Sequence, residues 1–141
     1  MSVVRKTLWE LALAISLSVA GWFYLAKPLD APVAPIACAN IIEGCGNQSL
    51  KVRLDQAPHV MKPFKLLIEA GGAREVHASF AMQGMEMGLN RYRLIRQADN
   101  SWKAEVTLPV CIQGRSDWVM LVEVAEVVGA KHYQLAFQAL P

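Results

Sequence analysis

Residues 75–82 have the sequence EVHASFAM, and this stretch decides the fold class. Apolar side chains occupy every second position, and more polar ones stand between them: the apolar set is Val76, Ala78, Phe80 and Met82. An alternation of period two places these two sets on opposite faces of a β-strand. The stretch therefore predicts a strand with one buried face that ends near Met82.

The same alternation recurs along the chain after residue 49. It predicts further strands near residues 50–54, 64–68, 91–94, 102–108, 118–124 and 133–139. Turn-forming residues separate these segments, and no apolar pattern of helical period occurs after residue 30. About seven short strands of this kind are typical of an immunoglobulin-like β-sandwich. We therefore expect an all-β domain of this architecture over residues 49–141.

An apolar segment precedes this domain. Residues 8–26 (LWELALAISLSVAGWFYLA) contain one charge, and a helix of this length just spans a bilayer core of about 30 Å. Arg5 and Lys6 precede it, which favours a cytoplasmic N-terminus. We expect residues 1–27 to form a single-pass transmembrane anchor in the cytoplasmic membrane, with the following domain in the periplasm. A cleaved signal peptide is the alternative, because residues 18–20 (SVA) resemble a cleavage site.

The chain has three cysteines, at positions 38, 45 and 111. Residues 28–48, which hold the first two, are expected to be a proline-rich tether followed by a loop. Disulfides persist in an oxidising compartment such as the periplasm. At most one intramolecular disulfide can form from three cysteines, and both Cys38–Cys45 and Cys45–Cys111 remain possible.

Residues 82–88 (MQGMEMG) concentrate three of the chain's six methionines. Thioether sulfur is a soft ligand that suits Cu(I), and methionine is also common in cores and adaptable contact surfaces. Met82 continues the buried series of its strand, which favours core packing. Met85 and Met87 are two residues apart, so in extended backbone both project to one side. They predict either a Cu(I) site or a hydrophobic contact with a protein partner.

Two other side chains could complete a copper site. Cys111 as a thiolate would be a strong Cu(I) ligand, although it could instead be buried or disulfide-bonded. His77 lies on the outward face of the strand that leads to the methionines, and histidine is a common copper ligand. Arg115 and Asp117, in the loop that follows Cys111, are expected to form a local ion pair or to cap the turn.

Several classes of function are excluded by composition and by missing motifs. The net charge is +2, and Lys and Arg are scattered without interleaved aromatic residues, so a nucleic-acid surface is not expected. The sequence has no nucleophile-elbow, zinc-protease or phosphate-loop motif. We therefore expect neither an enzyme nor a small-molecule substrate.

Taken together, these motifs resemble the FixH/YtkA-like group of small membrane-anchored periplasmic β-sandwich proteins. The resemblance covers the anchor and residues 64–125. It is carried by MQGMEMG at 82–88, WKA at 102–104, LP at 108–109 and WVMLV at 118–122. Members of the group are associated with copper handling or the assembly of respiratory oxidases. The resemblance implies a copper-binding accessory role here, with Met82, Met85 and Met87 on the metal side and a membrane complex as partner.

Overall fold

The computed structural model describes residues 32–85, 90–110 and 114–141, where the regular structure consists of β-strands. The expected membrane anchor at residues 8–26 lies outside these ranges. Within them, no helix is long and apolar enough to span a bilayer.

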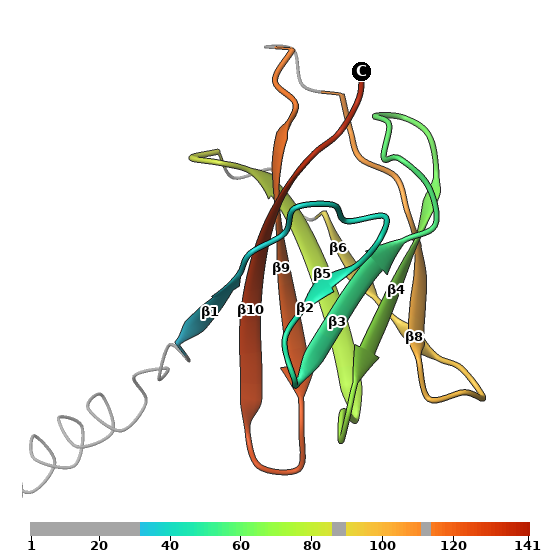
Figure 1. Cartoon of the computed structure of the whole chain (residues 1–141), viewed down its shortest axis with the longest axis vertical. Coiled ribbons are helices and arrows are strands. Elements are labelled where there is room, and N and C mark those ends of the chain that lie inside the picture. Colours follow the sequence, from blue (N-terminus) through green and yellow to red (C-terminus); the bar gives the residue numbers. More distant parts are fainter. Residues whose placement is uncertain (1–31, 86–89, 111–113) are drawn as a thin grey trace, which may run out of the picture. The chain divides into compact units, whose positions relative to one another are not determined.

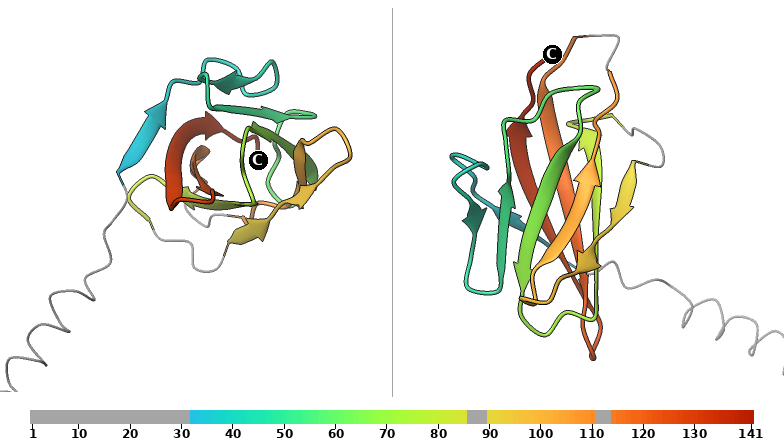
Figure 2. Two further views of the ribbon diagram at one scale, coloured as in Figure 1. Left: turned by 90° about the horizontal axis from the view of Figure 1, so that it is seen from below. Right: turned by 90° about the vertical axis from the view of Figure 1, so that its right-hand side faces the viewer.

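Two five-stranded sheets face each other as layers (Figures 1 and 2). The first sheet has the order β1 (Val33–Ile36), β10 (Ala130–Gln138), β9 (Asp117–Ala125), β5 (Glu75–Met82) and β6 (Arg91–Arg93). The second sheet has the order β2 (Cys45–Gly46), β3 (Leu50–Leu54), β4 (Phe64–Ala70), β8 (Trp102–Val106) and β7 (Ile95–Arg96). Neighbouring strands are antiparallel throughout, except that β1 runs parallel to β10.

The predicted alternation places one apolar face of each sheet inside the domain. In β5 every second residue from Val76 to Met82 is buried, and β9 and β10 follow the same rule. Side chains from both sheets form one core, in which Trp118 and Phe64 are the largest fully buried members. This confirms the prediction of an all-β sandwich, and each of the seven predicted segments coincides with a strand.

Three short strands, β1, β2 and β7, were not expected. Residues 28–48 were predicted to be tether and loop, yet Val33–Ile36 adds to the edge of the first sheet and Cys45–Gly46 to the edge of the second. Strands this short carry too few residues for a periodic signal. Pro35 is tolerated in β1 because an edge strand can lack one ladder hydrogen bond.

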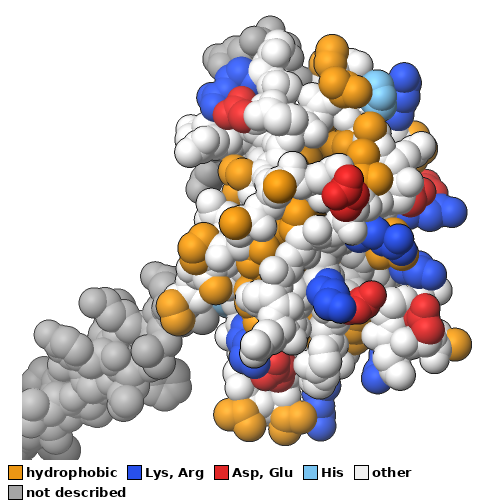
Figure 3. All heavy atoms as spheres, in the orientation of Figure 1, with side chains coloured by type: hydrophobic (Ala, Val, Ile, Leu, Met, Phe, Trp, Pro, Cys, Tyr) orange, Lys and Arg blue, Asp and Glu red, His pale blue; other side chains and the backbone are white. Residues whose placement is uncertain are grey.

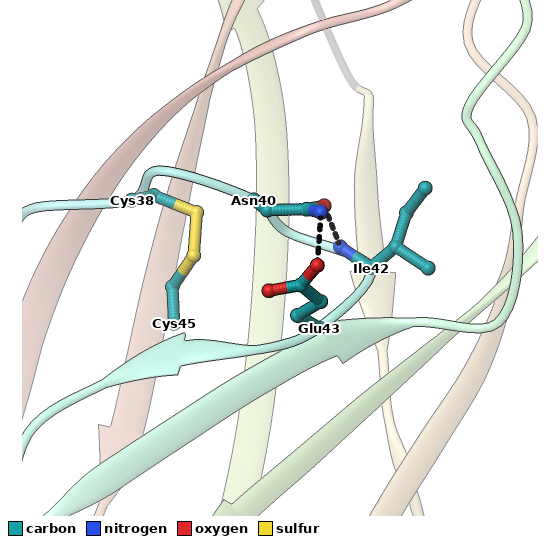
Figure 4. The surroundings of a disulfide bond; sticks show 5 residues. All are labelled: Cys38, Asn40, Ile42, Glu43 and Cys45. Carbon is teal, nitrogen blue, oxygen red and sulfur yellow. Dashed lines mark hydrogen bonds between the residues drawn. A yellow bond between two sulfur atoms is a disulfide. The ribbon is translucent and has the colours of Figure 1, made fainter.

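A disulfide joins Cys38 to Cys45 and closes the loop that connects the two sheets (Figure 4). Inside this loop the Asn40 side chain accepts a hydrogen bond from the Ile42 N–H at 3.1 Å and donates one to Glu43 at 3.0 Å. The pairing settles the alternative that the sequence left open. It leaves Cys111 outside the bond.

Strand register gives the domain two distinct ends. Glu75 of β5 pairs with Ala125 of β9 beside the turns at residues 71–74 and 126–129; we call this the hairpin end. Met82 pairs with Trp118 at the opposite end, where the methionine-rich segment leaves β5 and the chain enters β9; we call this the loop end. β9 has nine residues, so the two ends are about 30 Å apart.

Candidate functional site

The methionine-rich segment leaves β5 through a tight turn at the loop end. The Met85 N–H donates to the Met82 carbonyl at 3.0 Å, and Gly84 between them has a φ of 76°. A positive φ at the third position of a four-residue turn is the geometry of a type II turn, which favours glycine there. The Met85 side chain is half-buried and packs against the core. The turn therefore holds Met85 at the rim of the sandwich.

Arg115 ties this turn to the segment that enters β9. Its guanidinium donates to the Gln83 carbonyl at 3.1 Å and, from Nε, to the Asp117 carboxylate at 2.9 Å. The hydrogen bond from Arg115 holds the pKa of Asp117 below its ordinary value, so this carboxylate stays ionised at neutral pH. The predicted Arg115–Asp117 pair is thus confirmed, and it also joins two loop stems that are far apart in sequence.

A third segment, residues 59–61, lies at the same end. Val60 forms an isolated bridge with Leu108, and the Met61 N–H donates to the Leu108 carbonyl at 2.9 Å. The Met61 side chain is 67% exposed, and its φ of 60° is uncommon for a residue other than glycine. The sequence pattern did not single out this residue, because an isolated bridge between distant segments leaves no periodic signal. An exposed thioether thus lies at the loop end.

Of the predicted ligands, one is sealed in the core at this end and another lies elsewhere on β5. Met82 is 1% exposed and belongs to the core, in agreement with the packing role that its position in β5 favours. His77 lies five residues earlier in β5, about 16 Å along the strand. Its Nε2 faces the Glu75 carboxylate at 3.6 Å on the outward face of the first sheet. His77 is therefore too far away to share a metal with Met85.

The remaining two predicted ligands, Met87 and Cys111, lie outside the described residues. Their neighbours are placed, however. Met87 follows the Met82–Met85 turn, and Cys111 follows Val110 on the chain that passes residues 59–61. The last described residues before these two positions, Met85 and Val110, thus belong to segments at the loop end.

A groove of about 460 Å³ opens beside these stems. Its wall combines apolar side chains, including Ile41, Phe137 and Leu140, with Gln83 and Asp117. The last two are the hydrogen-bond partners of Arg115, and we call these three residues the Arg115 clamp. The clamp therefore also shapes a surface depression between the disulfide loop and the ends of β9 and β10.

The donors that the structure describes at the loop end include soft ones. No group of three or more His, Cys, Asp or Glu side chains suited to a metal occurs in the described part of the chain. The accessible donors described at this end include the thioethers of Met61 and Met85, and thioethers favour Cu(I) over Mg²⁺ or Ca²⁺. Met85 would supply one ligand, and the other donors would have to come from the adjoining segments.

No family model and no curated protein matches this chain. Among solved structures, the chain is similar to a crystal structure of an engineered protein, with a TM-score of 0.48 and 15% sequence identity over 64% of this chain. The chain spans 20% of the length of that engineered protein.

Proposed function

We propose that this chain is a membrane-tethered periplasmic accessory protein whose immunoglobulin-like sandwich binds Cu(I) at its loop end. Met85 and Met87 would act as thioether ligands and Cys111 as a thiolate ligand. The role would be copper handling or the assembly of a respiratory oxidase. The hydrogen bond from Arg115 to the Gln83 carbonyl carries this proposal, because it joins the stem of the methionine segment to the loop that contains Cys111.

The donor chemistry makes the proposal specific. Thioethers need no deprotonation before they bind a metal, whereas a cysteine must lose its proton. A site built from Met85 and Met87 alone would therefore bind Cu(I) with nearly constant affinity from mildly acidic to neutral pH. A contribution from Cys111 would make the affinity rise with pH until the thiol is fully ionised.

Competition for Cu(I) against a chromogenic chelator, at several pH values, tests the proposal. The Met85→Leu/Met87→Leu double variant keeps apolar volume and removes both sulfur atoms. We expect its affinity to fall by roughly 100-fold, which corresponds to about 2.7 kcal/mol. Met82→Leu is the matched control, since this sealed side chain should leave affinity unchanged. Absence of competition by the unmodified chain would refute the copper proposal.

A metal-free interaction module is the second candidate, and one observation favours it. The loop end exposes three large apolar side chains on paired segments: Met61, Val110 and Leu140. Leu140 also lines the groove described above, and a partner subunit of a membrane complex could cover this part of the surface. Under this alternative Met61→Ser would weaken the complex, while the Met85→Leu/Met87→Leu variant would keep full activity. The opposite outcome would support the copper site.

A further inference from the structure

The tip of the β9–β10 hairpin displays two apolar side chains with no packing role. Val127 is 70% exposed and Val128 is 92% exposed. The Glu126 N–H donates to the Gly129 carbonyl at 2.9 Å and closes the turn around them. Turns of this kind usually carry Gly, Asn, Asp, Ser or Pro, so two valines here are unusual. Figure 3 shows hydrophobic side chains at the lower tip of the domain, where this hairpin ends in Figure 1.

The chain upstream of the domain joins it at this same end. β1 runs parallel to β10, and its first residue, Val33, pairs with His132. Only two residues of β10 separate that pair from the turn, which is about 7 Å along the strand. The valine tip therefore projects beyond the point at which residue 33 enters the sheet.

The length of the intervening chain limits how far this end can stand from a bilayer. Here the inference rests on the proposed function, in which residues 8–26 span the membrane. Residues 27–32 then connect the span to Val33, and six extended residues reach about 20 Å at most. The hairpin tip extends about 7 Å along the strand beyond the Val33–His132 pair. A tether of this length keeps the hairpin end, beside which residue 33 enters the sheet, within reach of the bilayer.

Charged groups around the tip suit a lipid surface. Lys131 Nζ lies 2.7 Å from the Glu126 carboxylate, so the acidic residue at the turn is neutralised. Arg74 lies beside the hairpin through its N–H, which donates to the Ala125 carbonyl at 2.8 Å. Among the described residues its exposed side chain takes part in no ion pair, which leaves its charge available to anionic headgroups.

We propose that Val127 and Val128 dip into the headgroup region of the membrane and form a second contact point beside the tether. Apolar side chains flanked by cations commonly bind the interface in this way. The contact would hold the strands upright on the bilayer, with the thioether-bearing loop end about 30 Å from the hairpin end.

Depth-dependent fluorescence quenching on the full chain tests this inference. Val128→Cys, in a Cys111→Ser background, carries an environment-sensitive NBD label. The chain is reconstituted into phosphatidylcholine–phosphatidylglycerol vesicles whose acyl tails bear nitroxides. Met61→Cys, labelled identically, is the matched control, because it is similarly exposed but lies at the loop end. We expect a blue shift and loss of emission at position 128, and neither at position 61.

The outcomes separate this inference from the proposal on which it rests. Vesicle flotation first shows whether the chain is anchored. If the chain floats and the two labels respond alike, the hairpin contact is refuted and the anchor survives. A chain that remains in the aqueous fraction refutes both. Val127→Cys provides a second labelling position, and circular dichroism identifies any labelled variant that has lost its β-structure.

Discussion

Reduction of the Cys38–Cys45 disulfide should destabilise the domain by an amount that can be calculated from the loop it closes. The two cysteines are separated by 7 positions in the sequence. The chain-entropy model gives about 2.5 kcal/mol for a closed loop of roughly eight residues. The bond also joins the end of β1 to β2, so its loss frees the connection between the two sheets.

Urea unfolding of the full chain in mild detergent, followed by tryptophan fluorescence, measures this effect. With a slope of about 2 kcal/mol/M, reduction should lower the midpoint by roughly 1.2 M. The Cys38→Ala/Cys45→Ala variant serves as the control, because its midpoint should not respond to reductant. Thiol titration of the unfolded, unreduced chain should find one reactive thiol, that of Cys111.

Two results would contradict this reasoning. An unchanged midpoint on reduction would mean that the hydrogen bonds of Asn40, rather than the covalent link, order the loop. Three reactive thiols in the unreduced chain would mean that the disulfide does not form.

Three further changes test individual contacts. Gly46→Ala should cost about 1–3 kcal/mol, because a Cβ atom there would lie 2.2 Å from the Leu50 carbonyl oxygen; Gly71→Ala, where nothing lies within 4 Å, should be tolerated in the same urea assay. Tyr92→Phe should lower the free energy of unfolding by about 1 kcal/mol. The Tyr92 hydroxyl donates a hydrogen bond to the Thr107 carbonyl at 2.8 Å and accepts one from the Thr107 N–H at 3.2 Å. The lowered pKa of Asp117 means that its stabilising contribution is complete above the unfolded-state value of about 3.9 and is lost as pH falls through the lower folded value. Thermal unfolding at a series of acidic pH values should therefore show a weaker pH dependence for Asp117→Asn than for the unmodified chain.

Each of these expectations has a clear contrary result. Equal losses for the two glycine variants would show that backbone flexibility, and not the close approach at residue 46, decides the effect. An unchanged midpoint for Tyr92→Phe would show that water replaces the lost hydrogen bond. If Asp117→Asn and the unmodified chain had the same dependence of thermal stability on acidic pH, the hydrogen bonds between Arg115 and Asp117 would not persist in solution.

Regular alternation made the larger strands predictable from sequence. β5, β9 and β10 bury one face and leave the other at least partly accessible over eight or nine residues, which is long enough for the period to be recognised. β1 and β7 have four and two residues, and their pairing depends on neighbours elsewhere in the chain. The alternation over residues 91–94 predicted an inward Leu94, and this residue is buried; the passage of the chain from β6 in one sheet to β7 in the other could not be read from the alternation.

The candidate site could be predicted only where residues are close in sequence. The core role of Met82 followed from its place in β5, and the Arg115–Asp117 pair followed from its spacing. The bond from Arg115 to Gln83 joins residues 32 positions apart, and the exposed position of Met61 depends on the bridge between Val60 and Leu108. His77 was grouped with the methionines because it shares their strand, although the strand itself separates them.

The parallel pairing of β1 with β10 has a mechanical consequence. A pull on the upstream chain runs along the axis of β1, so it loads the β1–β10 ladder in shear instead of opening its bonds one at a time. If those four residues gave way, the strain would reach Cys38 and pass through a covalent bond into the second sheet. The domain should therefore resist unfolding from β1 when force is applied to the chain that precedes it.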